Sequence, residues 1–233
     1  MKKLLIITSL IFVANTVTLQ AQNDEEAKPP SSQKFVSVEV MKPMFWFMRD
    51  LGYVIEAEFS YQHKALIYNI NGGYSDIKDE IYDDLDYQNT GSYVKFGIGF
   101  QLNYSNKVIR SSSLIIGTNL IFTSFDESGI VLNDFSNYGV LGEAITQKNS
   151  PRGGEFYFTY RKVFDSNFFF SATPRIAVVL SRFNDEKFPV YYVPGFGVVN
   201  GSNDSDFSIG PTTTSNRGEA VAIGLSIKIG YRF

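Results

Sequence analysis

The sequence predicts an all-β protein, an antiparallel up-and-down transmembrane β-barrel of eight strands, with ten strands as the alternative. Three observations lead to this fold class. Eight segments alternate apolar and polar residues, which gives each strand one apolar and one polar face. The connections between them alternate between short and long, as in barrels with short periplasmic turns and long extracellular loops. Aromatic residues make up 15% of the chain, with 21 Phe and 14 Tyr, which suits an apolar outer band with aromatic girdles.

The N-terminal segment, 1–21, has the organisation of a secretory signal peptide. A lysine pair precedes an apolar run over 4–17, and Ala21 offers a small residue for cleavage. The apolar run is short for a membrane span, although an uncleaved anchor helix is the alternative. Residues 22–34 are polar and contain a Pro-Pro pair, so we expect a disordered periplasmic linker before a barrel over 35–233.

The first half of the barrel contains four predicted strands. Residues 35–41 (FVSVEVM) place a valine at every second position, and residues 52–62 (GYVIEAEFSYQ) alternate large apolar residues with glutamate and serine. Residues 65–73 (ALIYNINGG) set leucine, tyrosine and isoleucine against asparagines. Residues 92–103 (SYVKFGIGFQLN) alternate apolar residues with lysine, glycine and glutamine. In each strand we expect the apolar set to face lipid and the polar set to face the interior.

The second half repeats this pattern. Residues 113–124 (SLIIGTNLIFTS), 154–163 (GEFYFTYRKV) and 168–181 (FFFSATPRIAVVLS) form the next three strands; Pro174 lacks a ladder donor, which predicts a local bulge there. The last segment, 217–233 (RGEAVAIGLSIKIGYRF), alternates most strictly and ends on an aromatic residue. We expect it to close the barrel by pairing with the first strand.

The predicted connections differ in length from one end of the barrel to the other. The long ones span 42–51, 74–91, 125–153 and 182–216, and the short ones span 63–64, 104–112 and 164–167. An even strand number places both termini in the periplasm and the long loops outside. The ten-strand alternative stays open because residues 130–145 could contain an additional hairpin.

The polar faces predict a charged interior. An eight-stranded barrel is just wide enough for side chains to fill it, and its inward charges must pair because an isolated buried charge is very costly. Five acids and five bases fall on inward positions. The expected network consists of Glu39, Glu56, Glu58, Lys95, Glu155, Arg161, Arg175, Glu219, Lys228 and Arg232. A packed salt-bridge network is favoured over the alternative, a narrow water-filled channel.

The sequence offers little for catalysis. The chain contains no cysteine, which excludes disulfides, thiol catalysis and cysteine zinc sites. Its single histidine, His63, falls in a predicted periplasmic turn, away from the outer leaflet where a barrel hydrolase would need it, and no G-x-S-x-G elbow occurs. The net charge of −3 gives no reason to expect nucleic acid as a partner. We therefore expect no catalytic residue and no cofactor.

The predicted loop over 76–86 (DIKDEIYDDLD) is the most acidic stretch. Carboxylates are hard oxygen ligands that bind Ca²⁺ or bridge lipopolysaccharide through divalent ions, but the spacing matches no EF-hand loop. A solvated surface loop is favoured over cation binding. The weak metal candidates are Asp76, Asp79, Glu80, Asp83, Asp84 and Asp86.

Two aromatic clusters fall in predicted extracellular loops. Exposed aromatic residues at this density would form a binding surface. A plug of aromatic residues packed together over the barrel mouth, or an anchor at the interface, is favoured over such a surface. The candidate surface residues are Phe45, Trp46, Phe47, Tyr191, Tyr192 and Phe196.

Several motifs resemble one family. They are a Val-x-Val-x-Val run from Val36 followed by Lys42-Pro43, GSYVK over 91–95, the Phe168-Phe169 pair, and PVYYVPGFG over 189–197, which is the most specific. On these motifs the chain resembles an uncharacterised family of barrel-like proteins from Bacteroidota, catalogued only as a domain of unknown function. The resemblance covers nearly the whole mature chain and implies a barrel, but it brings no activity, ligand or site residue.

Together these features predict a small non-enzymatic barrel in the outer membrane of a Gram-negative bacterium, with a structural or surface-binding role through its loops. The expected partners are outer-membrane lipid and lipopolysaccharide, an unidentified surface ligand, and the barrel assembly machinery, which would recognise the terminal Phe233. A narrow pore for small solutes is the first alternative. A barrel enzyme acting on lipid or surface glycan, and a soluble periplasmic β-protein, are the others.

Overall fold

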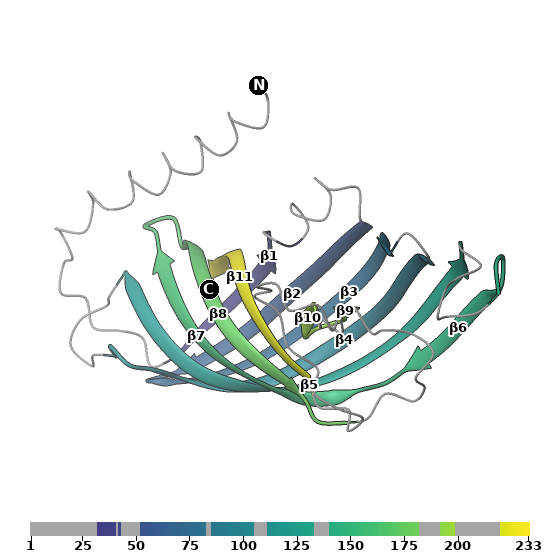
Figure 1. Ribbon diagram of the computed structural model, residues 1–233. Coiled ribbons are helices and arrows are strands. Elements are labelled where there is room, and N and C mark those ends of the chain that lie inside the picture. Colours follow the sequence, from purple (N-terminus) through teal and green to yellow (C-terminus); the bar gives the residue numbers. More distant parts are fainter. Residues whose placement is uncertain are drawn as a thin grey trace.

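The computed structural model describes residues 32–40, 42, 52–82, 85–104, 111–132, 140–181, 192–198 and 220–233. Figure 1 shows long strands that curve around a common interior, with a short hairpin of β9 (Tyr192–Val193) and β10 (Gly197–Val198) among them. No helix within the described ranges is long and apolar enough to cross a membrane. The predicted signal peptide and most of the predicted linker lie outside these ranges.

Eight antiparallel strands close into a ring. They are β1 (Ser32–Glu39), β2 (Gly52–His63), β3 (Leu66–Tyr82), β4 (Leu85–Gln101), β5 (Ser112–Val131), β7 (Arg152–Val163), β8 (Phe168–Val179) and β11 (Ala220–Arg232). Each strand pairs with the next in this order, and β11 pairs with β1, so that Val36 lies opposite Tyr231 and Val38 opposite Ile229. The predicted eight-stranded transmembrane β-barrel is confirmed. Its first strand begins at Ser32, slightly before the predicted start.

The outward face of the ring is a continuous apolar belt. Large side chains that a soluble core would bury point away from the protein here: Ile55, Leu120 and Ile223 are 55%, 60% and 60% exposed. A belt of this extent on a closed barrel is the surface that meets lipid acyl chains. The alternation along each strand produces it, because every second residue on a strand points to the same face.

Aromatic pairs border the belt. The long connections leave one end of the barrel, here called the long-loop end, and the short turns leave the other, the short-turn end. The rings of Tyr53 and Tyr74 lie 5.9 Å apart at the long-loop end. At the short-turn end, Tyr231 packs against Phe168 at 5.3 Å and against Phe233 at 5.1 Å. Such girdles are typical of the two membrane–water interfaces.

Two hairpins continue past the belt at the long-loop end, which corrects two predicted loops. β3 runs to Tyr82 and β4 begins at Leu85, so most of the predicted 74–91 loop is strand; β5 likewise runs to Val131. The prediction ended these strands where their outward residues stop being apolar. On β5 the outward residues after Phe122 are serine, aspartate and serine, although the inward ones remain buried. The lipid-facing part of β5 therefore ends at Phe122, while the sheet goes on.

A further strand, β6 (Ala144–Asn149), completes this region and decides the strand number. β6 pairs with β5 next to the stretch of β5 that pairs with β7, with Phe125 opposite Asn149 and Phe122 opposite Arg152. β6 and β7 are thus successive parts of one course, interrupted at Ser150-Pro151, and β6 adds no strand to the ring. We call the projecting part of the sheet the extension; it comprises 75–82, 85–91, 124–131 and 144–149.

The predicted bulge at Pro174 is wrong. Tyr157 pairs with Arg175 and Tyr160 pairs with Ala172, which is the same register on both sides of the proline. No residue is inserted; pairing with β7 lapses around Pro174, whose nitrogen carries no hydrogen to donate. Pairing with β11 is unbroken, with Leu225 opposite Pro174, and this second neighbour keeps the strand in place.

Candidate functional site

The barrel interior is filled by two groups of paired charges. In the first, the carboxylate of Glu155 on β7 lies between two cations: Lys95 Nζ at 2.9 Å and Arg175 Nη1 at 2.7 Å. Asn119 donates a third hydrogen bond to the same carboxylate, at 2.8 Å. All four residues are almost fully buried. Burial of these charges is tolerated because each has close partners of opposite sign or a hydrogen bond.

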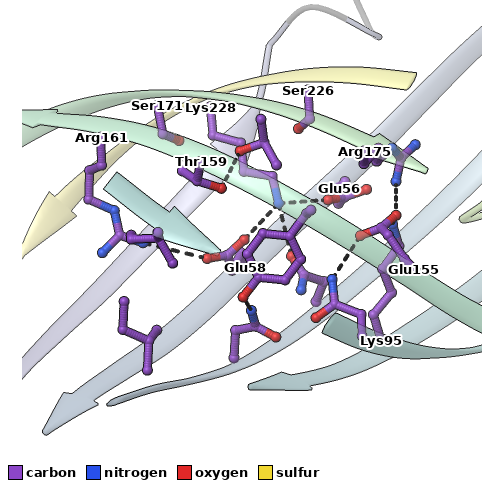
Figure 2. A pocket seen from close by; sticks show the side chains of 17 residues that line it. Glu56, Glu58, Lys95, Glu155, Thr159, Arg161, Ser171, Arg175, Ser226 and Lys228 are labelled. Carbon is purple, nitrogen blue, oxygen red and sulfur yellow. Dashed lines mark hydrogen bonds and ion pairs between the residues drawn. The ribbon is translucent and has the colours of Figure 1, made fainter. Parts of the chain in front are cut away.

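The second group centres on Lys228 of β11 (Figure 2). Its ammonium lies 2.8 Å from Glu56 and 2.7 Å from Glu58, and it donates to the Asn71 side chain at 2.9 Å. The Arg161 guanidinium approaches Glu58 from the other side at 4.0 Å. β2 supplies both acids on successive inward positions, so its alternation places two carboxylates against a single lysine.

Lys42 joins this network from the connection between β1 and β2. Its ammonium reaches Glu56 at 3.1 Å, and the Tyr93 hydroxyl donates to the same carboxylate at 2.5 Å. Burial, and after it the nearby Arg175, lower the pKa of Lys42. Glu56 therefore binds one cation from a strand and one from a connection, which ties the β1–β2 connection to the interior.

A hairpin formed by β9 and β10 closes the long-loop half of the interior. Val193 and Phe196, which are 0% and 1% exposed, pack in one apolar cluster with wall residues of β5, β8 and β11. Tyr192 packs with Val54 and Ile77 of β2 and β3. The hairpin thus contacts opposite sides of the ring and occupies its lumen, as Figure 1 shows.

Polar contacts and glycines fix the hairpin in place. Asn89 donates to the carbonyl of Tyr192 at 3.0 Å, and Arg175 donates to the carbonyl of Gly195 at 3.2 Å. Gly195 has φ +84°, in the region that glycine adopts without strain. On the wall, a Cβ at Gly153 would clash with the Val178 backbone oxygen of β8 and would also lie 2.7 Å from the Phe196 ring. Gly153 therefore leaves room for both the neighbouring strand and the hairpin, and Arg175 connects the hairpin to the ionic interior.

An aromatic cluster closes the short-turn half. Phe35, Val163 and Phe169 pack together near the end of the barrel, and the Arg161 guanidinium lies over the rings of Phe35 and Phe169 at 4.2 and 5.1 Å. Such cation–π contacts stabilise a guanidinium away from water. Between the two closures lies a polar cavity of about 30 Å³, lined by residues that include Tyr157, which is room for one or two water molecules.

The predicted interior residues lie mainly where the alternation places them. Eight of them face the lumen, namely Glu39, Glu56, Glu58, Lys95, Glu155, Arg161, Arg175 and Lys228. Glu39 accepts hydrogen bonds from Ser226 and from the backbone of Ile227. Arg232 lies at the short-turn end, where it donates to Asn167 at 2.7 Å. Glu219 lies outside the described residues.

Of the two alternatives for the aromatic clusters, the structure shows the favoured plug for two residues. Tyr192 and Phe196 are buried inside the barrel, so for these two the exposed binding surface is wrong. They lie within the lumen and not over its mouth, because the length of a connection does not say how far it folds back. Phe45, Trp46, Phe47 and Tyr191 lie outside the described residues.

The acidic stretch also differs from its prediction as a loop. Asp76 and Asp86 lie on β3 and β4, and Asp76 accepts hydrogen bonds from Gln88 at 3.1 Å and Thr90 at 3.3 Å. Asp79 and Glu80 lie on β3, and Asp83 and Asp84 lie outside the described residues. Among the described residues, no group of three His, Asp or Glu side chains is placed to hold a metal ion. His63 is exposed at the end of β2, next to the turn.

Glu127, a buried acid in the extension, is absent from the predicted set of inward charges. It is 1% exposed; Tyr87 donates to it at 2.6 Å and Asn149 at 2.9 Å. No ion pair joins it to a lysine or arginine of the described segments. Burial raises the pKa of Glu127 to about 7, although these hydrogen bonds oppose the shift. Asn89 connects Tyr87 to the hairpin carbonyl of Tyr192.

These features define the protein as a small transmembrane β-barrel whose interior is filled and closed. The chain belongs to the family described as "Domain of unknown function (DUF6048)", which it matches over residues 1–213. The predicted membership of a barrel family of unknown function is thereby confirmed, while the Bacteroidota source stays a prediction. No curated protein matches the chain.

Solved structures resemble the fold. A major outer membrane protein from Thermus thermophilus superposes with a TM-score of 0.50 at 10% identity, covering 88% of this chain and 100% of that one. The N-terminal β-barrel domain of Pseudomonas aeruginosa OprF gives 0.42 at 9%, covering 87% and 98%. Neisserial surface protein A (NspA) gives 0.43 at 9%, covering 87% and 95%. At such identities the likeness concerns the fold alone.

Proposed function

We propose that this protein is a sealed, non-enzymatic barrel of a bacterial outer membrane, with a structural or surface role carried by its long-loop end. The observation that supports this most is the double closure of the lumen. The β9–β10 hairpin fills one half, the Phe35 cluster closes the other, and ion pairs occupy the space between them. A barrel closed in this way contacts lipid through its apolar belt, and its extension is exposed outside the membrane.

The test of this proposal is conductance in planar bilayers. The full-length protein is expected to give no steady single-channel current. A matched variant has residues 192–198 replaced by a Gly-Ser segment of equal length, and Phe35 and Phe169 replaced by alanine. It is expected to conduct weakly, because both closures of the lumen are then removed. Steady currents from the unaltered protein would support the alternative, a narrow pore for small solutes.

A barrel enzyme acting on lipid or surface glycan is less well supported. His63, the only histidine in the sequence, lies at the short-turn end. The buried carboxylates Glu56 and Glu155 and the half-buried Glu58 are each bound by cations, which leaves them poor general bases.

The orientation and export route complete the proposal. We place the short turns and both termini in the periplasm and the extension outside, following the usual asymmetry of outer-membrane barrels. Export would use the predicted N-terminal signal peptide, and the assembly machinery would recognise the C-terminal strand through Phe233. That residue is 71% exposed and packs on Tyr231 at the periplasmic girdle, so its ring is accessible to a partner.

A further inference from the structure

The outward face of the extension begins where the lipid-facing belt ends. On three consecutive strand courses the outward residues change from apolar to polar at one level, and on β3 the change comes one outward position later, at Asp76. Ser92 of β4 lies opposite Ser124 of β5, and the Ser124 hydroxyl lies 3.4 Å from that of Ser150 on the next course. Above this level β3, β4 and β5 continue, and β6 continues the fourth course after the interruption at Ser150-Pro151. Apart from Ile130, which is exposed on β5, their described outer surface is mainly polar, and we call it the wall; it stands directly over lipid-facing surface.

A hollow of about 200 Å³ lies on this wall. The strand registers align Lys78, Gln88, Ser128 and Thr146 side by side across β3, β4, β5 and β6, and Asp86 and Ile130 form the next row. All six line the hollow. A cavity of about 150 Å³ is enough for one six-membered ring, so the hollow has room for one sugar.

The chemistry of the hollow suits a phosphorylated sugar. The Lys78 ammonium is a donor for a phosphate oxygen, and Asp86, Gln88, Ser128 and Thr146 offer both acceptors and donors to ring hydroxyls. Ile130, which is 47% exposed, presents an apolar contact for the C–H face of a ring. The mixture of one cation, one carboxylate, two hydroxyls and an amide recognises a polyhydroxylated anion better than it recognises a simple phosphate.

We propose that this hollow binds the phosphorylated sugar headgroup of an outer-leaflet glycolipid, with Lys78 on the phosphate and Ser128 and Thr146 on sugar hydroxyls. The occupant follows from continuity. Ser128 lies about 20 Å along β5 beyond Phe122, the last lipid-facing residue, so a glycolipid whose acyl chains lie on the belt below reaches the hollow with the phosphorylated sugars of an extended headgroup. The proposal rests on the outer-membrane location proposed above, and it gives that location a specific lipid contact.

Native mass spectrometry of the full-length protein released from nanodiscs tests the proposal. The nanodiscs contain phospholipid with a small fraction of lipopolysaccharide, or of phosphatidylglycerol as an anionic lipid without sugar. Lys78→Ala is expected to lower retention of lipopolysaccharide about tenfold, the equivalent of one charge-assisted hydrogen bond. Ser128→Tyr, which fills the hollow, is expected to abolish it. The matched control is Lys148→Ala, because Lys148 lies on the same face, is 72% exposed and does not line the hollow.

The outcomes distinguish a failure of the glycolipid site from a failure of the proposed outer-membrane location. Heat-modifiable migration shows first that every variant is a folded membrane barrel; a protein that fails to enter nanodiscs contradicts the location, not the hollow. Equal retention of lipopolysaccharide and phosphatidylglycerol, or equal losses in Lys78→Ala and Lys148→Ala, overturns the site. Free core oligosaccharide that binds as tightly as the intact glycolipid overturns the choice of a lipid ligand.

Discussion

At the residue scale, Arg175 connects the ionic interior to the hairpin. It pairs with Glu155 and donates to the Gly195 carbonyl. We expect Arg175→Leu to lower the free energy of unfolding by roughly 1.5–3 kcal/mol, because it removes one of the two cations from a buried carboxylate that Lys95 still binds. Urea unfolding in detergent, followed by circular dichroism, measures the change.

The control for this substitution is Lys148→Leu. The Lys148–Asp126 pair is 3.9 Å long with both side chains about 70% exposed, and exposed pairs of this kind contribute about 0–1 kcal/mol. Similar losses for the two variants would show that the interior pairs are not what stabilises the barrel.

Glu127 predicts a pH dependence. It lies beyond the lipid-facing part of β5, faced by Tyr87 and Asn149 and by no cation of the described residues. Because burial raises its pKa to about 7, the folded state favours the protonated form. Stability is then highest below the unfolded pKa, falls by about 3 kcal/mol as the pH rises from about 4.5 to 7, and is level above that.

Glu127→Gln is the variant that isolates this effect. Glutamine keeps an acceptor for Tyr87 but cannot ionise, so the decline in unfolding free energy between pH 5 and 7 should shrink by most of that amount. An unchanged pH profile would assign the titration to another group.

Single inward charges could be predicted from the sequence where they lie on alternating strands, but not elsewhere. Alternation places Glu56, Glu58 and Lys228 on inward positions, and closure of β11 on β1 brings them together, so their pairing follows from the sequence. Lys42 could not be found this way, because it lies in a connection and no periodicity says where a connection points. Glu127 was missed because the apolar outward pattern ends before it.

At the element scale, the β9–β10 hairpin is predicted to control access to the lumen. The chain has no cysteine, so Ala222→Cys introduces a single thiol in the cluster that Val193 and Phe196 complete. In an otherwise unaltered barrel, this thiol should resist a water-soluble reagent. Adding Phe196→Ala should speed its labelling at least tenfold, because the ring that covers it is gone.

Phe158→Ala is the matched control, since Phe158 points toward lipid and is 37% exposed. It should leave the labelling rate of the thiol unchanged. Rapid labelling with Phe196 in place would mean that the hairpin does not seal the lumen in solution. The sequence makes the hairpin motif conspicuous but does not decide whether the hairpin lies outside or inside the barrel. That depends on contacts with strands around the ring, among them β2, β3 and β5.

At the scale of the whole molecule, the closed ring and the belt predict membrane behaviour. The folded protein should migrate differently in detergent gels before and after boiling, and it should fractionate with outer membranes. Recovery in the periplasmic extract, with no heat-modifiable form, would contradict the membrane location. The fold itself was predictable because the lipid-facing alternation repeats in eight segments, whereas the extension, with polar outward residues, left no such signal.

The hairpin's place in the chain has a consequence for assembly. It lies between β8 and β11, and β11 is the strand that closes the ring on β1. The hairpin that fills the lumen therefore lies directly before β11, the strand that closes the ring, in the order of strands. A barrel caught before this step has an open seam and an unfilled, hydrated lumen in which Arg175 lacks its hairpin contact. Closure of the wall and filling of the centre thus depend on neighbouring parts of the chain.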